Sequence, residues 1–481
     1  LHSLRRRQRQ MCIRDRIMTE KKRGSFSGTI GFVLAAAGSA VGLGNIWRFP
    51  YLAAKDNGGL FIFCYLILVF TFGFTLLITE IAIGRKTKQS PLTAYGKINK
   101  KFGFLGSLAT LVPIIILPYY CAIGGWVFKY FIDFISGKGT LAAQDGYFSN
   151  FISGKSEPII WLLVFIAATA GVVLGGVDKG IEKMGKVLMP ILVILIIGIS
   201  VFSLTLKYTD EATGITRTGL QGLKLYLIPN FKGVTFKQFF LVIMDAMGQL
   251  FYSISVAMGI MVAYGSYVPD KTNINKSINQ IEIFDTVVAI LAGLMIVPAV
   301  YVFAGTEGMS AGPGLMFISL PKVFNQMGKV GTVIGIVFFL MVIFAAVSSS
   351  VSIMEAIVAS IMDKFKLSRK KSAVLVTVYS VVLGIIVCLG YNVFYFELKL
   401  PTGAVGQILD IFDYVSNNIL MPVVAILTCI LIGWVAKPKT VIDEVTKNGE
   451  KFGRKYIYIG MVKVVAPVLL AILLLQALGA F

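Results

Sequence analysis

Charged residues and histidine are scarce in this chain of 481 residues. Charged side chains make up 14% of the sequence, 56% of it is hydrophobic, and His2 is its one histidine. An ordinary soluble domain carries about 25% charged residues. The composition therefore excludes a soluble enzyme, a disordered chain and a nucleic-acid-binding protein. The lack of histidine also excludes histidine-dependent catalysis and histidine-rich metal sites.

Cysteine is sparse as well, and its spacing carries no metal or disulfide pattern. None of the five cysteines forms a CxxC pair, and most of them lie inside apolar runs. They are typical of small buried hydrophobic residues rather than metal ligands or a disulfide framework. These residues are Cys12, Cys64, Cys121, Cys388 and Cys429.

Long apolar runs make up most of the sequence. A helix needs about 20 apolar residues to cross a bilayer, and these runs are too long and too unalternating for a β-barrel. We therefore predict an all-α polytopic membrane protein with eleven transmembrane helices and no soluble domain. Their approximate ranges are 28–54, 59–84, 104–136, 158–176, 183–206, 236–265, 280–304, 332–362, 373–391, 406–435 and 456–480.

The net charge of +21 is distributed over the connections between these runs. The connections near 85–101, 179–186, 271–276, 364–371 and 437–455 carry more Lys and Arg than the alternate set, which predicts that they are cytoplasmic. The N-terminus is then cytoplasmic, and eleven spans place the C-terminus outside.

Five segments follow from this reading. Residues 1–17 are strongly basic, and we expect a non-native or disordered tail, with a genuine basic tail as the alternative. Residues 18–27 form a cytoplasmic N-terminal segment. Helices 1–5 form a first repeat over 28–206, and helices 6–10 form a second over 207–435. Residues 436–481 hold a cytoplasmic loop and helix 11.

Two of the predicted spans contain a fault at membrane depth. The first carries three glycines within Gly38–Asn45, and the sixth carries a weaker version, Ser253–Gly259. Non-helical backbone in a membrane is tolerated where it lines a cavity, and two matched breaks are typical of inverted-repeat transporters. Small residues that merely allow close helix packing are the alternative.

Ionisable groups inside spans are costly and usually functional. Asp285 in span 7 and the hydroxyls of Ser348–Ser350 in span 8 would supply oxygen ligands, which hard cations such as sodium prefer. The other candidates are Glu80, Glu355, Asp410, Asp413 and Arg48.

The sequence from Gly38 to Tyr51, GSAVGLGNIWRFPY, closely resembles the neurotransmitter:sodium symporter family. Further motifs follow in order, namely 57–59 (NGG), 80–85 (EIAIGR), Tyr119–Tyr120, 249–259 and 345–350. The resemblance covers nearly the whole chain from about Arg23, and eleven spans resemble its prokaryotic branch. It implies a leucine-transporter-type 5+5 inverted repeat with helices 1 and 6 broken at the midplane, in a bacterial plasma membrane.

The resemblance also implies sodium-coupled uptake of an amino acid by alternating access, with two sodium ions and no organic cofactor. One sodium site would use Ala40, Asn45, Ser253 and Asp285, completed by the substrate carboxylate. The other would use Gly38, Val41, Ala345, Ser348 and Ser349.

A substrate site is implied beside these ions. Its carboxylate would meet Tyr120 and the N–H groups of Leu43 and Gly44. Its amine would meet Ala40, Phe251, Ser253 and Ser255. The side-chain pocket, which favours a hydrophobic or aromatic amino acid, would comprise Ile116, Tyr120, Ile123, Tyr252, Met258, Ser349 and Ile353.

Two departures from the family pattern refine this expectation. Asp285 stands where Asn is common and would put a fixed carboxylate near the family's chloride position. We therefore predict chloride independence, although the candidates Tyr65 and Gln249 are present and Ala289 supplies no hydroxyl. Gly42 stands where monoamine transporters carry Asp, which favours a substrate with its own carboxylate.

The same resemblance implies gates. Arg48 and Asp413 correspond to an outer gate, with Asp410 as the alternative partner, and Tyr120 with Tyr252 to a lid. Arg23 and Asp363 correspond to an inner gate.

Three further positions concern the cytoplasmic side. Phe26 stands where Trp is usual, so the inner latch is expected to be looser. Gly180 and Pro190 match a pattern linked to unwinding of span 5 and inward sodium release. A purely structural kink is the equal alternative.

Three other functions would each need a feature that the sequence does not supply. A transporter of another small zwitterion would need an aromatic cage, and Trp47 and Trp126 are not at pocket positions. A receptor or channel on the same scaffold would need a continuous polar path. An intramembrane enzyme would need an activated nucleophile. The expected partners are an amino acid and membrane lipid.

Overall fold

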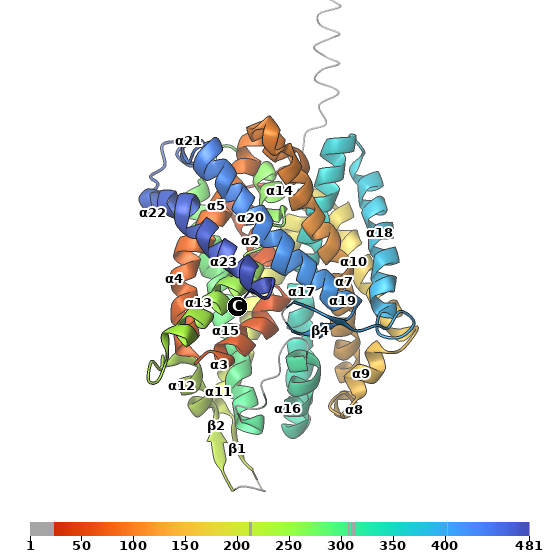
Figure 1. The fold of residues 1–481 in the computed structure, drawn as a ribbon. Helices are drawn as coiled ribbons and strands as arrows, with labels where there is room; N and C mark the ends of the chain where they lie inside the picture. Colours follow the sequence, from red (N-terminus) through yellow and green to blue (C-terminus); the bar gives the residue numbers. More distant parts are fainter. Residues whose placement is uncertain (1–23, 211–213, 306–307, 309–313, 402, 481) are drawn as a thin grey trace, which may run out of the picture.

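The computed structural model describes residues 24–210, 214–305, 308, 314–401 and 403–480, most of them in helices (Figure 1). Up to residue 206 the elements are α2 (Thr29–Ala40), η1 (Gly44–Arg48), α3 (Phe49–Lys55), α4 (Gly59–Leu68), η2 (Val69–Gly73), α5 (Phe74–Thr87), α6 (Pro91–Ile98), η3 (Lys100–Phe102), α7 (Gly103–Ile135), α8 (Gly139–Ala142), α9 (Tyr147–Ile152), α10 (Glu157–Leu174), η4 (Val177–Glu182) and α11 (Lys183–Thr205).

The remaining elements begin with a short antiparallel pair of strands, and a second pair lies before α19. They are β1 (Lys207–Thr209), β2 (Thr216–Thr218), α12 (Gly219–Leu227), α13 (Phe236–Ser253), α14 (Ile260–Tyr267), α15 (Ile274–Ala304), η6 (Leu315–Ser319), α16 (Leu320–Gln326), α17 (Gly328–Phe365), α18 (Arg369–Leu389), β3 (Leu398–Lys399), β4 (Val405–Gly406), α19 (Ile408–Asp413), η7 (Tyr414–Leu420), α20 (Met421–Ile430), η8 (Leu431–Val435), α21 (Lys439–Val445), α22 (Lys455–Gly460), η9 (Met461–Val465) and α23 (Ala466–Ala477).

The all-α membrane class is confirmed, but the count of eleven spans is not reached in full. Within the described ranges, nine helices are long and apolar enough to cross a membrane, or ten if the bent pair that begins with α2 is one span. α13 and α14 occupy the place of the expected sixth span. Residues 254–259 separate them, and this wide break keeps the pair out of the count.

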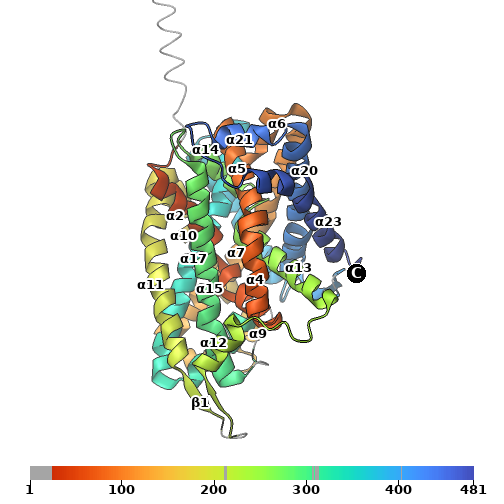
Figure 2. The same cartoon turned by 90° about the vertical axis from the view of Figure 1, so that its left-hand side faces the viewer.

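The connections gather at two opposite ends of the helix bundle. α6, the end of α14 and α21 lie at one end, whereas α9, α12 and the strand β1 lie at the other (Figures 1 and 2). We call these the α21 end and the β1 end. The loops that the charge pattern assigns to the cytoplasm therefore share one end of the molecule, the α21 end.

Small residues allow two of the central helices to pack backbone against backbone. A Cβ atom added to Gly84 of α5 would lie 2.1 Å from the carbonyl oxygen of Val262 in α14. One added to Gly265 would lie 2.4 Å from the carbonyl oxygen of Ile81. Helices in membranes associate through such small-residue contacts because burying apolar side chains offers no gain over lipid.

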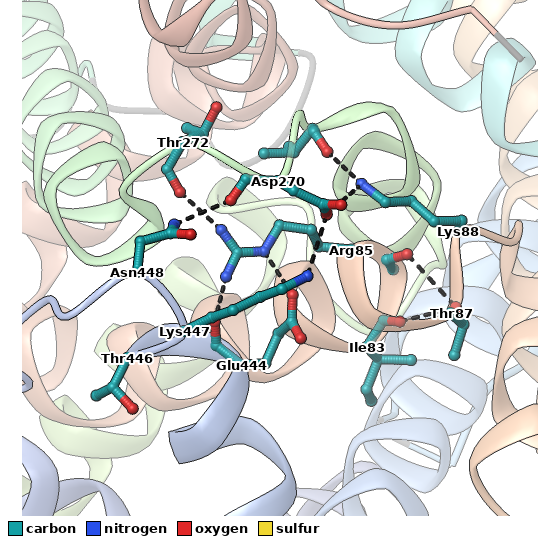
Figure 3. Close-up of polar contacts among 12 residues, drawn as sticks. Ile83, Arg85, Thr87, Lys88, Asp270, Thr272, Glu444, Thr446, Lys447 and Asn448 are labelled. Atoms are coloured by element: carbon teal, nitrogen blue, oxygen red, sulfur yellow. Dashed lines mark hydrogen bonds and ion pairs between the residues drawn. The ribbon is translucent and has the colours of Figure 1, made fainter.

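A buried arginine at the α21 end joins three segments that are far apart in the sequence (Figure 3). The Arg85 side chain at the end of α5 is fully buried. Its Nε donates to Glu444 Oε1 at 2.7 Å, and its Nη1 donates to the carbonyl of Thr272 at 2.6 Å. Its Nη2 donates to the backbone carbonyl of Glu444. Each guanidinium nitrogen therefore has an acceptor.

A more exposed set of charges surrounds this arginine. Lys88 Nζ and Lys447 Nζ lie 3.0 Å and 3.5 Å from Asp270 Oδ1, and Asn448 donates to the Asp270 carbonyl at 2.9 Å. The hydrogen bond from Lys88 is the main reason that the pKa of Asp270 lies below its ordinary value. We call the whole set the Arg85 network: Arg85, Lys88, Asp270, Thr272, Glu444, Lys447 and Asn448.

Candidate functional site

The two expected helix breaks are present, and they lie against each other. α2 ends at Ala40, and the helix that resumes at Gly44 is bent away by 56°. Between α13 and α14, Ser255, Ala257 and Gly259 have φ values of 55°, 60° and 71°. A left-handed conformation is strained for a non-glycine residue, so packing must hold Ser255 and Ala257 in place. Strain of this kind clusters at functional sites.

A buried carboxylate connects the first break to α15. Asp285 accepts hydrogen bonds from Asn45 Nδ2 at 2.8 Å and from Ser253 Oγ at 2.9 Å. The Tyr65 hydroxyl donates to its second oxygen at 3.4 Å. Asn45, Ser253 and Asp285 therefore converge as expected from the sequence, and their oxygens form what we call the Asp285 cluster. Ala40 is also buried at the end of α2.

A second group of oxygens surrounds one hydroxyl of α17. Ser349 Oγ lies 3.5 Å, 3.1 Å and 3.3 Å from the carbonyl oxygens of Gly38, Ser39 and Val41. A hydroxyl has a single proton and can satisfy only one of three acceptors well. The carbonyls at the C-terminal end of a helix also carry partial negative charge. This Ser349 cluster therefore has the oxygen ligands and the negative potential that suit a small hard cation.

Neighbouring residues complete this second cluster. Ser348 Oγ donates to the carbonyl of Ala345 at 3.0 Å, and a Cβ added to Gly38 would lie 3.4 Å from Ser348 Cβ. The expected set of Gly38, Val41, Ala345, Ser348 and Ser349 thus lies in one neighbourhood. No group of three or more His, Cys, Asp or Glu side chains that could hold a metal ion occurs in the described part of the chain.

A buried cavity of about 30 Å³ lies between the two breaks. Ten of the expected substrate-site residues line it, and Ile123, Phe251 and Ser253 do not. The lining residues are Ser39, Ala40, Gly42, Leu43, Gly44, Asn45, Ile116, Tyr120, Tyr252, Ser255, Met258, Ser349 and Ile353.

The sequence reasoning missed Ser39 in this lining. Ser39 directly precedes Ala40 at the end of α2, and its carbonyl accepts hydrogen bonds from both Ser255 and Ser349. Its position inside the glycine-rich motif was a signal. Nothing in the sequence, however, identifies which carbonyl of that motif meets two hydroxyls from other helices.

A second cavity of about 160 Å³ lies beyond Tyr252, on the side of the α13 helix. Tyr252 lines both cavities, and Phe251 lines this second one. The Arg48 guanidinium carbon lies 5.7 Å from the centre of the Tyr252 ring, a cation–π distance. Tyr252 therefore separates the buried cavity from the second one, as a lid would.

The expected outer-gate residues have other partners in the structure. The Asp413 carboxylate accepts hydrogen bonds from Asn417 Nδ2 at 2.6 Å and from the Tyr119 hydroxyl at 3.1 Å. Asp410 caps its own helix through the backbone N–H of Gln407 at 2.9 Å. The pairing of the gate stays a prediction.

At the α21 end, Arg23 of the expected inner gate lies outside the described residues. Its partner Asp363 accepts the backbone N–H of Ser90 at 2.7 Å. Phe26 is buried, its ring lies 5.7 Å from that of Tyr264, and its N–H donates to the Tyr267 carbonyl. The latch position is therefore packed even with Phe in place of Trp.

The two span 5 residues lie on either side of Glu182, which contacts the segment just before span 1. Gly180 is in the π-helix η4 and Pro190 is inside α11. In η4, Glu182 accepts hydrogen bonds from the N–H and the hydroxyl of Ser27, and Lys186 lies 2.6 Å from the same carboxylate. Unwinding here would release Ser27, and it stays a prediction.

Two further carboxylates from the sequence have structural partners. Glu80 accepts the N–H of Ala257, in the strained break, at 2.6 Å. Glu355 binds Arg369 through both oxygens at 2.7 Å and accepts a bond from the Tyr267 hydroxyl. Both side chains are buried, and these bonds stabilise the break and the α21 end.

Comparison with known proteins identifies the family of this chain. The chain matches the sodium:neurotransmitter symporter family over residues 23–145 and 149–481. The chain belongs to this family. It is a sodium-dependent transporter, and the family consists of transporters rather than enzymes.

Relatives from three domains of life match over most of this symporter. The "uncharacterized sodium-dependent transporter YhdH" of Bacillus subtilis (strain 168) is 33% identical, over 96% of this chain and 99% of the relative. A transporter of Methanocaldococcus jannaschii is also 33% identical, over 96% and 92%. The human "sodium- and chloride-dependent GABA transporter 2" is 26% identical, over 88% and 75%.

A solved structure gives the same result for the fold of this symporter. The crystal structure of MhsT in complex with L-phenylalanine superimposes with a TM-score of 0.82 at 32% identity. The match covers 95% of this chain and all of that chain. The fold expectation of a leucine-transporter-type membrane protein is confirmed, and the chain is a multi-pass membrane protein.

Proposed function

We propose that this symporter imports a hydrophobic or aromatic amino acid together with two sodium ions, independently of chloride. The main support is the space around Gly42. A Cβ added there would lie 2.7 Å from Ser349 Oγ and 3.2 Å from the Tyr120 hydroxyl. A side chain at this position would crowd both hydroxyls, and glycine gives the site no carboxylate here. This arrangement favours a substrate that brings its own carboxylate to a site that binds cations.

The polar part of the substrate has defined partners in this proposal. Its carboxylate meets Tyr120 and the N–H groups of Leu43 and Gly44, because the Leu43 N–H has only a weak partner, the Tyr120 hydroxyl at 3.5 Å. Its ammonium group meets the carbonyls freed at the two breaks, those of Ala40, Phe251 and Ser253, and the Ser255 hydroxyl. Helix ends bind such groups through unpaired N–H and C=O.

The substrate side chain meets an apolar wall. Ile116, Ile353 and Met258 line the buried cavity with the rings of Tyr120 and Tyr252. Met adapts to different shapes, which favours several large apolar amino acids over one small one. A quaternary-ammonium zwitterion is the second candidate. It fits less well because Trp47 and Trp126 are absent from the lining of this cavity.

Asp285 carries the proposal of chloride independence. Its carboxylate lies between Asn45, Ser253 and Tyr65, so a fixed negative charge faces the first sodium ion. A chloride ion beside Tyr65 and Gln249 would meet that charge across a medium of low dielectric, where repulsion is strong. Gln249 donates instead to the carbonyl of Gly44 at 3.1 Å, and Ala289 adds no hydroxyl.

Coupling follows from charge compensation in this site. Sodium at the Asp285 cluster and the substrate carboxylate neutralise each other, whereas either alone leaves a buried charge poorly compensated. The second ion at the Ser349 cluster binds between the end of α2 and α17. It therefore favours the arrangement in which these two helices touch. We further propose that the α21 end is cytoplasmic, in a bacterial plasma membrane, with the C-terminus outside.

Uptake into proteoliposomes tests this proposal. An amino-acid panel would be supplied with an inward gradient of sodium or potassium, each with chloride and with gluconate. We expect sodium-driven, chloride-independent uptake of a hydrophobic or aromatic amino acid. No sodium-driven uptake of any amino acid would overturn the substrate class and favour another zwitterion or a sensor on this scaffold.

A single substitution tests the role of Asp285. Asp285→Asn keeps the shape and removes the charge, so uptake should become dependent on chloride or be lost, by about tenfold or more. Ala289→Ser, which adds a hydroxyl without changing charge, is the control and should leave chloride independence intact. Chloride-independent uptake at the wild-type rate in Asp285→Asn would contradict the assignment.

A further inference from the structure

The carbonyl of Ser39 is the point where the two halves of the site meet. Ser255 Oγ, from the break in the sixth span, donates to it at 3.0 Å. Ser349 Oγ, from α17, donates to it at 3.1 Å. A carbonyl oxygen has two lone pairs, so both are used. One residue of α2 thus holds a hydroxyl of the substrate site and a hydroxyl of the second sodium site.

This carbonyl is available because the helix ends one residue later. The last four carbonyls of an α-helix have no partner inside it. The N–H of Val41 still bonds to the Ala37 carbonyl at 2.8 Å, but the carbonyls of Gly38 and Ser39 must find other donors. The break therefore creates the acceptor, and two serines from distant segments supply its donors.

The Ser39 side chain adds a second bond to the same partner. Ser39 Oγ donates to Ser255 Oγ at 3.2 Å, so the two residues are joined in both directions. Ser39 is buried, and Ser255 is held in a left-handed conformation with a φ of 55°. A strained residue persists only where its surroundings fix it, and the paired bonds to Ser39 are part of what fixes Ser255.

We propose that Ser39 is the positioning residue that couples sodium binding to substrate binding. This inference rests on the proposed function, in which sodium meets Ser349 and the substrate amine meets Ser255. When sodium binds the oxygen of Ser349 and the carbonyls of Gly38 and Val41, the Ser349 proton is left with Ser39 as its acceptor. The ion thereby fixes the Ser39 carbonyl, and through it the Ser255 hydroxyl, in the orientation that the substrate needs.

The Ser39→Ala variant separates this role from a simple effect on pocket shape. It removes the bond between the two side chains and keeps the Ser39 carbonyl, so the Ser255 hydroxyl is held by that carbonyl alone. Loss of one hydrogen bond corresponds to about a threefold to tenfold change in an equilibrium. We expect the sodium concentration that half-saturates substrate binding to rise by about that factor. Substrate affinity at saturating sodium should stay near the wild-type value.

The measurement uses the whole protein in detergent or proteoliposomes. Radiolabelled L-phenylalanine is the probe, or the amino acid that the uptake panel selects, titrated at increasing sodium chloride with choline chloride as the balance. Ser350→Ala is the matched control, since Ser350 adjoins Ser349 but its hydroxyl pairs with Thr169 at 2.8 Å, away from the cavity. The control should leave the sodium dependence unchanged. Ser39→Thr, which keeps the hydroxyl, should restore the wild-type curve.

A double-mutant cycle protects the test against a folding defect in one variant. Ser255→Ala removes both bonds to Ser39, whereas Ser39→Ala removes only the bond between the two side chains. Because that side-chain bond is absent once Ser255 is alanine, Ser39→Ala should have no further effect in the Ser255→Ala background, so the effects on sodium half-saturation should be non-additive. A Ser39→Ala curve that matches Ser350→Ala would overturn the inference. So would a loss of affinity that saturating sodium does not restore. Sodium-independent binding by the wild-type protein would overturn the proposed function, and this inference with it.

Discussion

The Arg85 network and the Ser349 cluster are both polar groups buried among apolar helices, yet they are built in opposite ways. The Arg85 guanidinium is a cation with just enough acceptors, because each of its nitrogens has its own oxygen. Ser349 brings one proton to three carbonyls that compete for it. In the Arg85 network the positive charge belongs to a side chain of the protein. The Ser349 cluster has more hydrogen-bond acceptors than donors, and a cation from solution can bind the unsatisfied acceptors.

The balance of hydrogen-bond donors and acceptors therefore distinguishes structural polar groups from functional ones in this protein. A buried network that is fully satisfied stabilises the fold, and breaking it is destabilising. A buried site with surplus acceptors costs stability until a ligand arrives. We therefore expect substitutions in the Arg85 network to act on unfolding and those in the Ser349 cluster to act on sodium.

Arg85→Met should have the largest effect on stability. It leaves the Glu444 carboxylate buried without its charge partner, and removing one member of a buried ion pair costs about 3–5 kcal/mol. The free energy of unfolding in detergent should fall by about that amount. Protein that remains folded should keep its sodium half-saturation. A shifted sodium curve with unchanged stability would reverse the roles assigned to the two regions.

Ser349→Ala should have the next largest effect, but on the sodium dependence of uptake rather than on stability. Loss of a ligating hydroxyl should raise the sodium concentration needed for half-maximal uptake by about tenfold to a hundredfold. Thermal stability without sodium should change little, because only the single hydrogen bond made by the Ser349 proton is lost. Ser350→Ala is the control at the next position. Equal sodium curves for the two alanine variants would remove Ser349 from the site.

Asp270→Asn should have the smallest effect. Lys88 and Lys447 depress the pKa of Asp270, so the carboxylate contributes stability above its unfolded pKa, and this is lost as pH falls through the lower folded pKa. The group is more than half exposed, so the pairs are worth well under about 1 kcal/mol. Melting curves from neutral to acidic pH should show the acid loss slightly reduced in Asp270→Asn. An unchanged acid loss would contradict it.

Local sequence features predicted what lies within one span. The glycines of 38–45 ended α2 as expected, because helix propensity is a property of neighbouring residues. Contacts across the chain could not be predicted in the same way. Arg85 lies in a recognisable motif, but Glu444 is 359 residues away and no periodicity connects them. Ser39 offers only a backbone carbonyl, which every residue has, so its two donors required the folded structure.

The sixth span shows a related limit. The sequence predicted one span over 236–265 with a break at Ser253–Gly259, and the structure has two helices separated by residues 254–259, with left-handed conformations at Ser255 and Ala257. Neither of these two residues is a glycine, so composition did not predict the left-handed conformations. The tertiary bonds from Glu80 and Ser39 override local preference at this point.

The π-helical turns of this chain have a consequence for how its sequence can change. η7 (Tyr414–Leu420) and η9 (Met461–Val465) each accommodate one residue more than an α-helical turn, within a span that otherwise continues on both sides. Deleting one residue inside such a turn restores the α-helix and keeps the flanking faces in place. The same deletion inside α17 would rotate every later side chain by about 100°. Single-residue length variation should therefore be tolerated at these turns and nowhere along α17.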